Sequence, residues 1–258
     1  MSQKRSKRKR SSREDYPLRE RLKIEEGVFD ERMMLSLRKL FSHGFVYTLG
    51  FIIAKGKEAD VYVAEGGERV DGTPVIVKIF RKENTNFENR MTYIIGDPRF
   101  EKIKMTASAL ASEWCRKEYG NLKLANAIGV RCPKPYIFSG NVLCMELIGE
   151  DGKPSQKLKA ARPENPAEML GKILGEIKKL YCGNLVHADI SEYNILIRGN
   201  EPYLIDFGQA VVLDHPNAES FLERDVHNIL AYFMKKYGIE KDENKVLEEI
   251  RAGKGSSG

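Results

Sequence analysis

The strongest constraint on this chain is a pair of neighbouring segments, LVHADISEYNILI at 185–197 and YLIDFGQA at 203–210, in which polar residues adjoin short apolar runs. The apolar runs have the length of short strands and flank a Gly-Asn turn, which predicts two strands joined by that turn. Asp189 and Asn194 precede the first strand, and Asp206 follows the second. We therefore expect these three side chains on two adjacent loops.

The spacing of the three residues indicates which reaction they could catalyse. An Asp, an Asn five residues later and an Asp twelve residues beyond it match the catalytic loop and the metal-binding loop of protein kinases. Phosphoryl transfer needs mainly positioning and neutralisation of phosphate charge, and Mg²⁺ prefers oxygen ligands, so we assign metal binding to Asn194 and Asp206. Asp189 is expected to accept the proton of the incoming hydroxyl, and His187 to brace the loop. The pattern predicts an ATP-dependent phosphotransferase.

The same template requires a lysine on a strand upstream, and the segment VIVKIF supplies Lys78. Its alternating apolar neighbours place it well to reach the α- and β-phosphates of ATP. The acid that pairs with it should come from the following helix. Glu118 fits because it lies on the apolar face of that helix, and Glu113 is the alternative. Together with Asp189 and Asp206, Lys78 completes the predicted catalytic set.

A loop that covers the phosphates is expected before this lysine, where kinases carry GxGxxG. Only the middle glycine is present, and alanines occupy the outer positions. Because glycine allows the backbone to approach phosphates closely, this loop should hold them less tightly, and its two lysines offset the loss in part with charge. The nucleotide contacts predicted up to the first long helix are Lys55, Gly56, Lys57, Val61, Lys78 and Glu118.

Three departures from ordinary protein kinases concern activation and substrate binding. Ala188 stands where many kinases have an arginine that binds a phosphorylated activation loop, and Ser191 stands where serine/threonine kinases usually have a phosphate-binding lysine. Only 50 residues follow Gly208, without an APE-type segment. The helical lobe is therefore expected to lack the usual activation and peptide-binding segments.

The net charge of +6 is concentrated at the N-terminus. Residues 1–13 hold seven Lys or Arg and no acid, so the whole chain's +6 less the tail's +7 leaves −1 for residues 14–258. Such a tail is attracted to polyphosphates without sequence specificity, and a solubilising extension is the alternative. No apolar run approaches the roughly 18 residues that cross a bilayer. The four scattered cysteines indicate neither zinc nor disulfides, so a cytoplasmic protein is expected.

The predicted elements form an α+β chain of two lobes, with strands in the first half and helices in the second. The expected parts are a basic, disordered tail at 1–27, a helix at 28–45, a β-rich N-lobe at 46–148 with an insertion at 81–112, and a short helical C-lobe at 149–258.

Several longer patterns resemble the RIO family of atypical serine/threonine protein kinases, and its type-one subgroup in particular. They are AKGKEADVY (54–62), YIIGDPRF (93–100), WxxKExxNL (114–122), HADISEYN (187–194), and DHPNA followed by FLxRD (214–225). The resemblance covers about residues 45–237. The type-two subgroup fits less well because it carries an N-terminal winged-helix domain, for which the preceding residues are too few and too basic.

The resemblance implies a two-lobed protein-kinase-like fold, ATP with Mg²⁺ or Mn²⁺, autophosphorylation on serine, and a role in maturing the small ribosomal subunit. It also implies ATPase activity, in which some relatives pass through a phospho-aspartate at the residue matching Asp206. Adenine is expected against the backbone of Glu146 and Ile148, with Met145 at the back of the pocket. The basic tail would suit pre-ribosomal RNA as a partner, and the protein substrate stays unknown.

Two alternatives remain open at this point. A nucleotide-gated switch that binds the ribosome, with incidental turnover, would keep the same Asp189 and Asp206. A small-molecule phosphotransferase of the aminoglycoside-kinase type also has an HxD loop without the lysine. Such enzymes carry a larger helical lobe than the residues from 149 onward provide.

Overall fold

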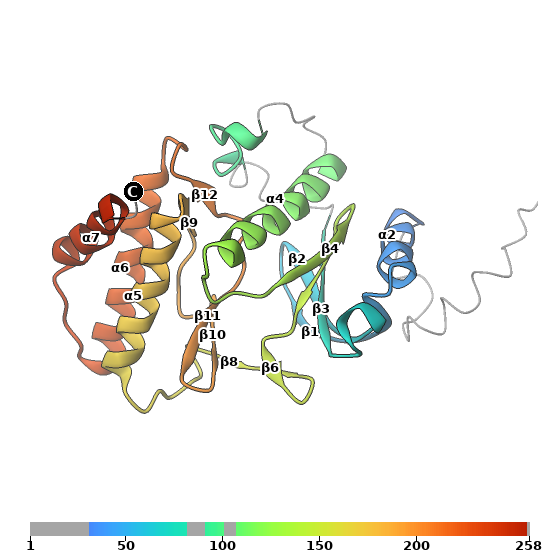
Figure 1. Cartoon of the computed structure of the whole chain (residues 1–258), viewed down its shortest axis with the longest axis horizontal. Coiled ribbons are helices and arrows are strands. Elements are labelled where there is room, and N and C mark those ends of the chain that lie inside the picture. The colour runs from blue at the N-terminus through green and yellow to red at the C-terminus, as the bar shows by residue number, and fades with distance from the viewer. Residues whose placement is uncertain (1–30, 82–90, 101–106, 257–258) are drawn as a thin grey trace, which may run out of the picture.

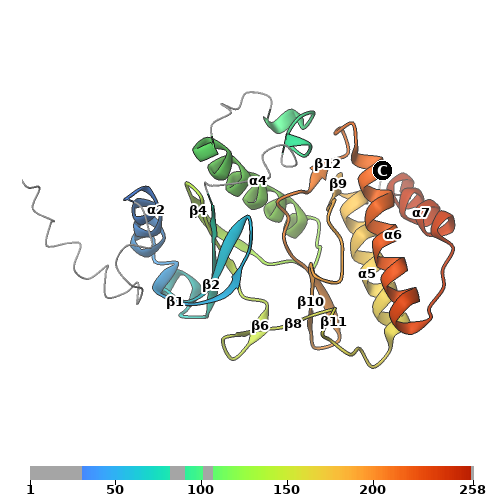
Figure 2. The same cartoon turned by 180° about the vertical axis from the view of Figure 1, so that it is seen from behind.

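The computed structural model describes residues 31–81, 91–100 and 107–256, and Figures 1 and 2 show its two lobes from opposite sides. The tail predicted at 1–27 and much of the insertion predicted at 81–112 lie outside the described residues. Within the described ranges, none of the helices combines the length and the apolar composition of a membrane span.

A five-stranded antiparallel sheet forms the first lobe, in the spatial order β1-β2-β3-β5-β4. β3 is buried along its whole length because a helix packs on each face of the sheet. Side chains alternate along a strand, so Val77 packs with one helix while Ile76 and Phe80 pack with the other. Lys78 lies on the same face as Ile76 and Phe80. The elements of this lobe are α2 (Glu31–Ser42), β1 (Val46–Lys55), β2 (Ala59–Gly66), η1 (Glu68–Val70), β3 (Val75–Phe80), η2 (Pro98–Phe100), α4 (Ala107–Ala127), β4 (Pro135–Ser139) and β5 (Val142–Glu146).

Three helices form most of the second lobe: α5 (Pro166–Cys182), α6 (Ala218–Tyr237) and α7 (Glu243–Ala252), followed by η3 (Gly253–Ser256). α5 begins where the Asn165 side chain accepts a hydrogen bond from the backbone N–H of Glu168, with proline in its first turn. α6 ends at Gly238, whose φ of +68° suits a residue without a side chain.

Short strand pairs connect the lobes and carry the polar loops. β10 pairs with both β11 and β8, β9 pairs with β12, and β6 pairs with β7. The bounds are β6 (Gly149–Glu150), β7 (Lys153–Pro154), β8 (Gln156–Lys157), β9 (Leu185–Val186), β10 (Ile195–Arg198), β11 (Glu201–Leu204) and β12 (Val211–Val212). The segment at the start of the predicted C-lobe thus adds the strand β8 beside β10.

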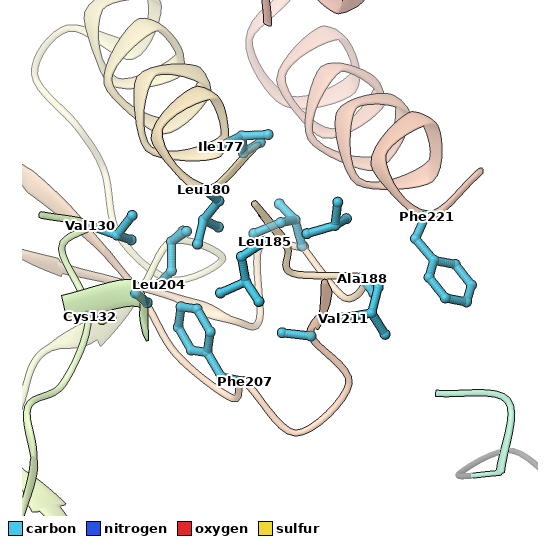
Figure 3. Close-up of a cluster of buried hydrophobic side chains, with 14 of the residues drawn as sticks. Val130, Cys132, Ile177, Leu180, Leu185, Ala188, Leu204, Phe207, Val211 and Phe221 are labelled. Carbon is cyan, nitrogen blue, oxygen red and sulfur yellow. The ribbon is translucent and has the colours of Figure 1, made fainter. Parts of the chain in front are cut away.

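A continuous apolar core joins α5 and α6 to the strands beneath them, as Figure 3 shows. Phe207 is fully buried in this core, directly beside the metal-binding Asp206 of the sequence prediction. Its neighbours in the figure include Leu180 from α5, Leu185 from β9 and Leu204 from β11. The loop between β11 and β12 is therefore anchored through its aromatic side chain. The prediction of a two-lobed α+β fold with a β-rich first lobe is confirmed.

Candidate active site

A cleft of about 530 Å³ lies between the lobes and takes its lining from both. This volume lies in the range of small-molecule sites. Its walls come from β1, β2 and β3, from the segment after β5, from the loop before β10 and from the loop after β11. The trio predicted from the sequence, Asp189, Asn194 and Asp206, lines this one cleft together with Lys78 and Glu118.

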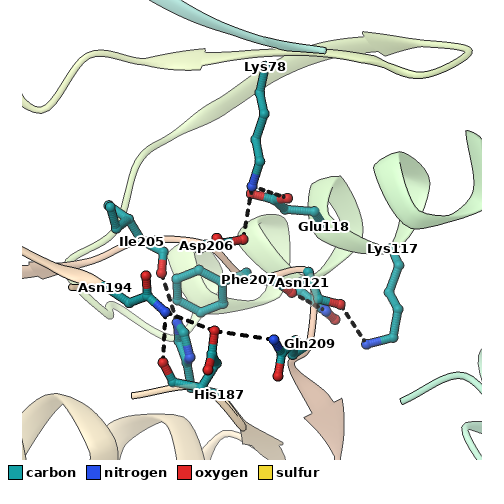
Figure 4. Close-up of polar contacts among 12 residues, drawn as sticks. Lys78, Lys117, Glu118, Asn121, His187, Asn194, Ile205, Asp206, Phe207 and Gln209 are labelled. Carbon is teal, nitrogen blue, oxygen red and sulfur yellow. Dashed lines mark hydrogen bonds and ion pairs between the residues drawn. The ribbon is translucent and has the colours of Figure 1, made fainter. Parts of the chain in front are cut away.

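Lys78 contacts both Glu118 and Asp206 in the charged network that Figure 4 shows. Its Nζ lies 2.7 and 2.9 Å from the two carboxylate oxygens of Glu118 and 2.9 Å from Oδ1 of Asp206. Burial opposes the charge on Lys78, but the carboxylates of Asp206 and Glu118 outweigh burial and raise its pKa above the usual range. Burial also favours the neutral form of Asp206, but the Lys78 ammonium outweighs burial and lowers the pKa of Asp206. The lysine therefore stays protonated and the aspartate ionised.

Glu118, rather than its alternative Glu113, is the partner that the structure places on Lys78. Glu118 is fully buried, whereas Glu113 lies five residues earlier on α4 and pairs with Arg116 at a distance of 2.6 Å. Arg116 and Glu113 are both partly exposed. The apolar face of α4 thus directs Glu118 to the cleft.

The carboxylate of Asp189, in the loop before β10, is held by hydrogen bonds from two side chains. Nδ2 of Asn194 donates to Oδ2 of Asp189 at 2.9 Å and also to its backbone carbonyl at 2.9 Å. Nε2 of Gln209 donates to the same Oδ2 at 3.2 Å. Burial, followed by the nearby charge of Asp206, raises the pKa of Asp189 to about 6. This is a carboxylate in reach of a general-base role near neutral pH.

The backbone of the same loop rests on α6. Asp225 is buried, and its two oxygens accept hydrogen bonds from the N–H groups of Ala188 (2.7 Å) and Ile190 (2.8 Å). Arg224 donates to the carbonyl of Ala188. Ala188 has a φ of +65°, a conformation that costs about 1–3 kcal/mol for a residue other than glycine. These contacts hold the strained residue directly before Asp189.

His187 is buried beneath the two loops, where its Nε2 donates to the carbonyl of Ile205 at 3.1 Å. Burial lowers the pKa of the imidazole from 6.5 to about 4. Between these pH values the unfolded chain binds a proton that the folded chain does not, so stability falls as the pH drops through this window.

This shift predicts a pH-dependent difference between the native protein and His187→Gln. Between pH 6.5 and pH 4 the free energy of unfolding should fall by about 3 kcal/mol more in the native protein, because each pKa unit corresponds to about 1.4 kcal/mol. Urea titrations at each pH measure it. Parallel pH curves for the two proteins would contradict a neutral His187.

Comparison with known proteins places this site in a family. A family model described as the RIO domain matches residues 60–246. The RIO-type serine/threonine-protein kinase Rio1 of Haloferax volcanii is 38% identical over 239 residues, which cover 93% of this chain and 81% of that protein. This chain belongs to the RIO family. It is an atypical serine/threonine protein kinase by family, and hence an ATP-dependent phosphotransferase.

Other RIO proteins agree with this assignment. Rio1 of Methanocaldococcus jannaschii is 37% identical over 218 residues, covering 84% of this chain and 73% of that protein. Among solved structures, the Rio2 kinase-ADP/Mg²⁺-phosphoaspartate complex of Chaetomium thermophilum has a TM-score of 0.65 at 22% identity, over 91% of this chain and 75% of that one. The structural likeness confirms the predicted kinase-like fold.

The RIO-family residues predicted to bind metal offer suitable atoms. The amide nitrogen of Asn194 is used by Asp189, so its oxygen is the atom available to a cation. Lys78 contacts Oδ1 of Asp206, and the Asp206 side chain is 47% exposed in the cleft. No cluster of three His, Cys, Asp or Glu side chains occurs in the described residues. An amide and a carboxylate, completed by phosphates and water, fit Mg²⁺.

Most of the remaining predicted nucleotide contacts also line the cleft: Gly56, Lys57, Val61, Met145, Glu146 and Ile148. Lys55 differs from the prediction because it is exposed and does not line the cleft. It pairs with Asp60 at the end of β1, beyond irregularities in the β1–β2 register. The flanking Ala54 and Gly56 do line the cleft.

The cleft also contains residues that were not predicted from the sequence, among them Gln209, Glu58 and Lys157. Gln209 contacts Asp189, and Glu58 and Lys157 supply charges to the lining. Lys157 lies on β8, which is joined to the loop of Asn194 by a hydrogen bond from Leu158 N–H to the Ile195 carbonyl (2.8 Å). Asp225 was part of a recognised pattern but had no assigned role. Only their long-range contacts reveal these roles.

Proposed function

We propose that this RIO-family chain binds ATP with Mg²⁺ or Mn²⁺ in the cleft and transfers the γ-phosphoryl group to a serine or threonine hydroxyl, including one of its own. The observation that carries this proposal is the convergence of Lys78, Glu118, Asp206, Asn194 and Asp189 on one cleft from four separate elements, namely β3, α4, the loop before β10 and the loop after β11. A protonated lysine beside an ionised aspartate and an amide suits a nucleotide-metal complex.

Each residue has a role that follows from its contacts. Lys78, fixed and kept charged by Glu118, is placed to bind nucleotide phosphates. Asp206 and Asn194 would hold the metal ion, which when bound neutralises phosphate charge. Asp189 is oriented by Asn194 and Gln209 to accept the proton of the acceptor hydroxyl. Its raised pKa keeps it basic enough for this step.

A second candidate function is an ATPase or nucleotide-gated switch that acts on a pre-ribosomal particle. Three observations favour it. The described C-lobe has three helices and no extended platform for a peptide, and residues 1–13 carry seven positive charges suited to RNA. Asp206 opens into the cleft, and a related Rio2 kinase was solved as a phosphoaspartate complex. In such a cycle the Asp206 carboxylate would attack the γ-phosphorus, ADP would leave, and water would release phosphate. A small-molecule phosphotransferase finds no further support.

Incubation of the purified protein with γ-labelled ATP and either Mg²⁺ or Mn²⁺ tests the proposal. We expect the label on the protein itself, stable to mild acid and base treatments that distinguish phosphoserine from phospho-aspartate. Lys78→Met serves as the control, because removing the phosphate-binding ammonium should prevent labelling. Absence of label and of phosphate release with every metal tried would overturn both the kinase and the ATPase and would leave only a nucleotide-gated switch.

A further inference from the structure

One face of α4 carries four large side chains with helical spacing, Trp114, Lys117, Glu118 and Asn121, and each is at most 1% exposed. They lie at positions i, i+3, i+4 and i+7, which fall on one stripe of a helix. Only Glu118 has a role in the site described so far. Lys117 and Asn121 are polar, and burying polar groups is costly unless they are bonded.

The side chains of Lys117 and Asn121 donate hydrogen bonds to backbone carbonyls of the loop that follows Asp206. Nζ of Lys117 donates to the carbonyls of Gly208, at 3.2 Å, and of Ala210. Nδ2 of Asn121 donates to the carbonyls of Phe207 and Ala210, each at 2.8 Å. Figure 4 shows both side chains reaching this loop from α4.

Trp114 lies against the same loop from the preceding turn of α4. A Cβ atom on Gly208 would lie 2.7 Å from Nε1 of Trp114, so only glycine fits at this position of the loop. The loop therefore lies flat against α4. Every backbone carbonyl that bonds to Lys117 or Asn121 belongs to residues 207–210, and β12 begins at the next residue.

The loop needs such support because Asp206 is strained. Its φ of +68° is a left-handed conformation that favours glycine and persists only when neighbouring contacts enforce it. Hydrogen bonds to the carbonyls of Phe207, Gly208 and Ala210 fix the direction of the chain just after Asp206. They thereby fix where its carboxylate points.

A second layer orients the amide of Asn121. Nη1 of Arg99 donates to Oδ1 of Asn121 at 2.8 Å, which leaves Nδ2 facing the loop. Arg99 is held in turn by Asp97, whose two oxygens lie 2.9 Å from Nε and 2.6 Å from Nη2. The Asp97 side chain is fully buried. The turn at 97–100 therefore holds the Asn121 amide in the orientation in which its nitrogen faces the loop.

We propose that Lys117 and Asn121 are positioning residues that clamp loop 206–210 to α4, so that the Lys78–Glu118 pair and the metal-binding carboxylate of Asp206 are assembled as one unit. In kinases generally, the position of this helix and the loop after the metal-binding aspartate controls activity. In this chain one face of α4 carries Glu118, which binds Lys78, and also Lys117 and Asn121, which bind loop 206–210. A purely structural role would be served equally well by apolar side chains, which often replace buried charges without loss of stability.

The test uses Lys117→Met and Asn121→Leu, which keep volume and remove the donors. With ADP present, Mn²⁺ binding measured by electron paramagnetic resonance should weaken by roughly 10–100-fold, the usual effect of losing a residue that supports a metal ligand. The turnover number should fall with it, while KM for ATP changes little. If either variant fails to fold, Arg99→Gln replaces it, because it disturbs the amide of Asn121 from the partly exposed second layer.

Asn126→Leu is the matched control. Asn126 also lies on α4 and donates to the backbone carbonyls of Leu122 (2.9 Å) and Pro133 (3.0 Å), but not to loop 206–210. It should alter melting temperature without weakening Mn²⁺ binding. The inference rests on the proposed function, which fails if the native protein neither binds Mn²⁺ with ADP nor turns over ATP. If the native protein does both, unchanged metal binding in the clamp variants, or equal weakening in Asn126→Leu, overturns the clamp alone.

Discussion

Replacing Asp206 with Asn is expected to lower ATP turnover and self-labelling by roughly 10²–10³-fold or more, because it removes the ionised carboxylate that is proposed to hold the metal ion together with the Asn194 amide. Lys78 would keep Glu118 as its partner, so the substitution should leave the fold intact. Steady-state turnover at increasing Mg²⁺ or Mn²⁺ measures the effect. High metal concentration should restore activity only in part.

Asp214→Asn is a suitable control for this prediction. It makes the same change of charge at an exposed residue just after β12, outside the cleft lining. Turnover in that variant should equal that of the native protein. If Asp206→Asn kept native turnover and native metal dependence, the assignment of Asp206 as a metal ligand would be wrong, and so would its assignment as an acceptor of the phosphoryl group.

Replacing Asp189 with Asn is expected to reduce phosphoryl transfer to a hydroxyl by about 10²–10⁴-fold, the usual contribution of a general base. The amide has the shape of the carboxylate but accepts no proton. Binding of ADP and Mn²⁺ should persist, because Lys78, Asn194 and Asp206 remain. Single-turnover transfer from labelled ATP separates this effect from binding.

The same variant distinguishes the two candidate functions. If hydroxyl transfer disappears while phosphate release through Asp206 continues, the ATPase candidate gains support. If both Asp189→Asn and Asp206→Asn bind pre-ribosomal particles normally and support growth, ATP chemistry is dispensable and a nucleotide-gated switch remains. Transfer at the native rate by Asp189→Asn would contradict its role as the base.

The positions predicted to carry the chemistry depended on short-range order in the chain. Asp189, Asn194 and Asp206 adjoin two short strands, and that order leaves little freedom in where their loops lie. Lys78 followed from alternation along a strand that is buried on both faces. The preference for Glu118 over Glu113 followed from the apolar face of a helix. These inferences needed only local periodicity, which a single sequence contains.

Other features depended on residues far apart in the chain. Lys55 does not line the cleft although the flanking Ala54 and Gly56 do, and the local sequence pattern does not indicate this difference. Asp225 reaches the backbone of Ala188 across 37 residues, and Lys117 reaches Gly208 across 91. Nothing in either local sequence indicates such a partner.

By itself, the sequence determined that this chain has two lobes, and it predicted a catalytic aspartate, a metal-binding pair and a phosphate-binding lysine. Their spacing leaves few other arrangements for short strands and loops. Only the tertiary structure decided which buried polar groups hold them in place. Buried side chains must find hydrogen-bond partners wherever the fold brings them. That requirement turned Asp225, Lys117 and Asn121 toward the backbone of the two catalytic loops.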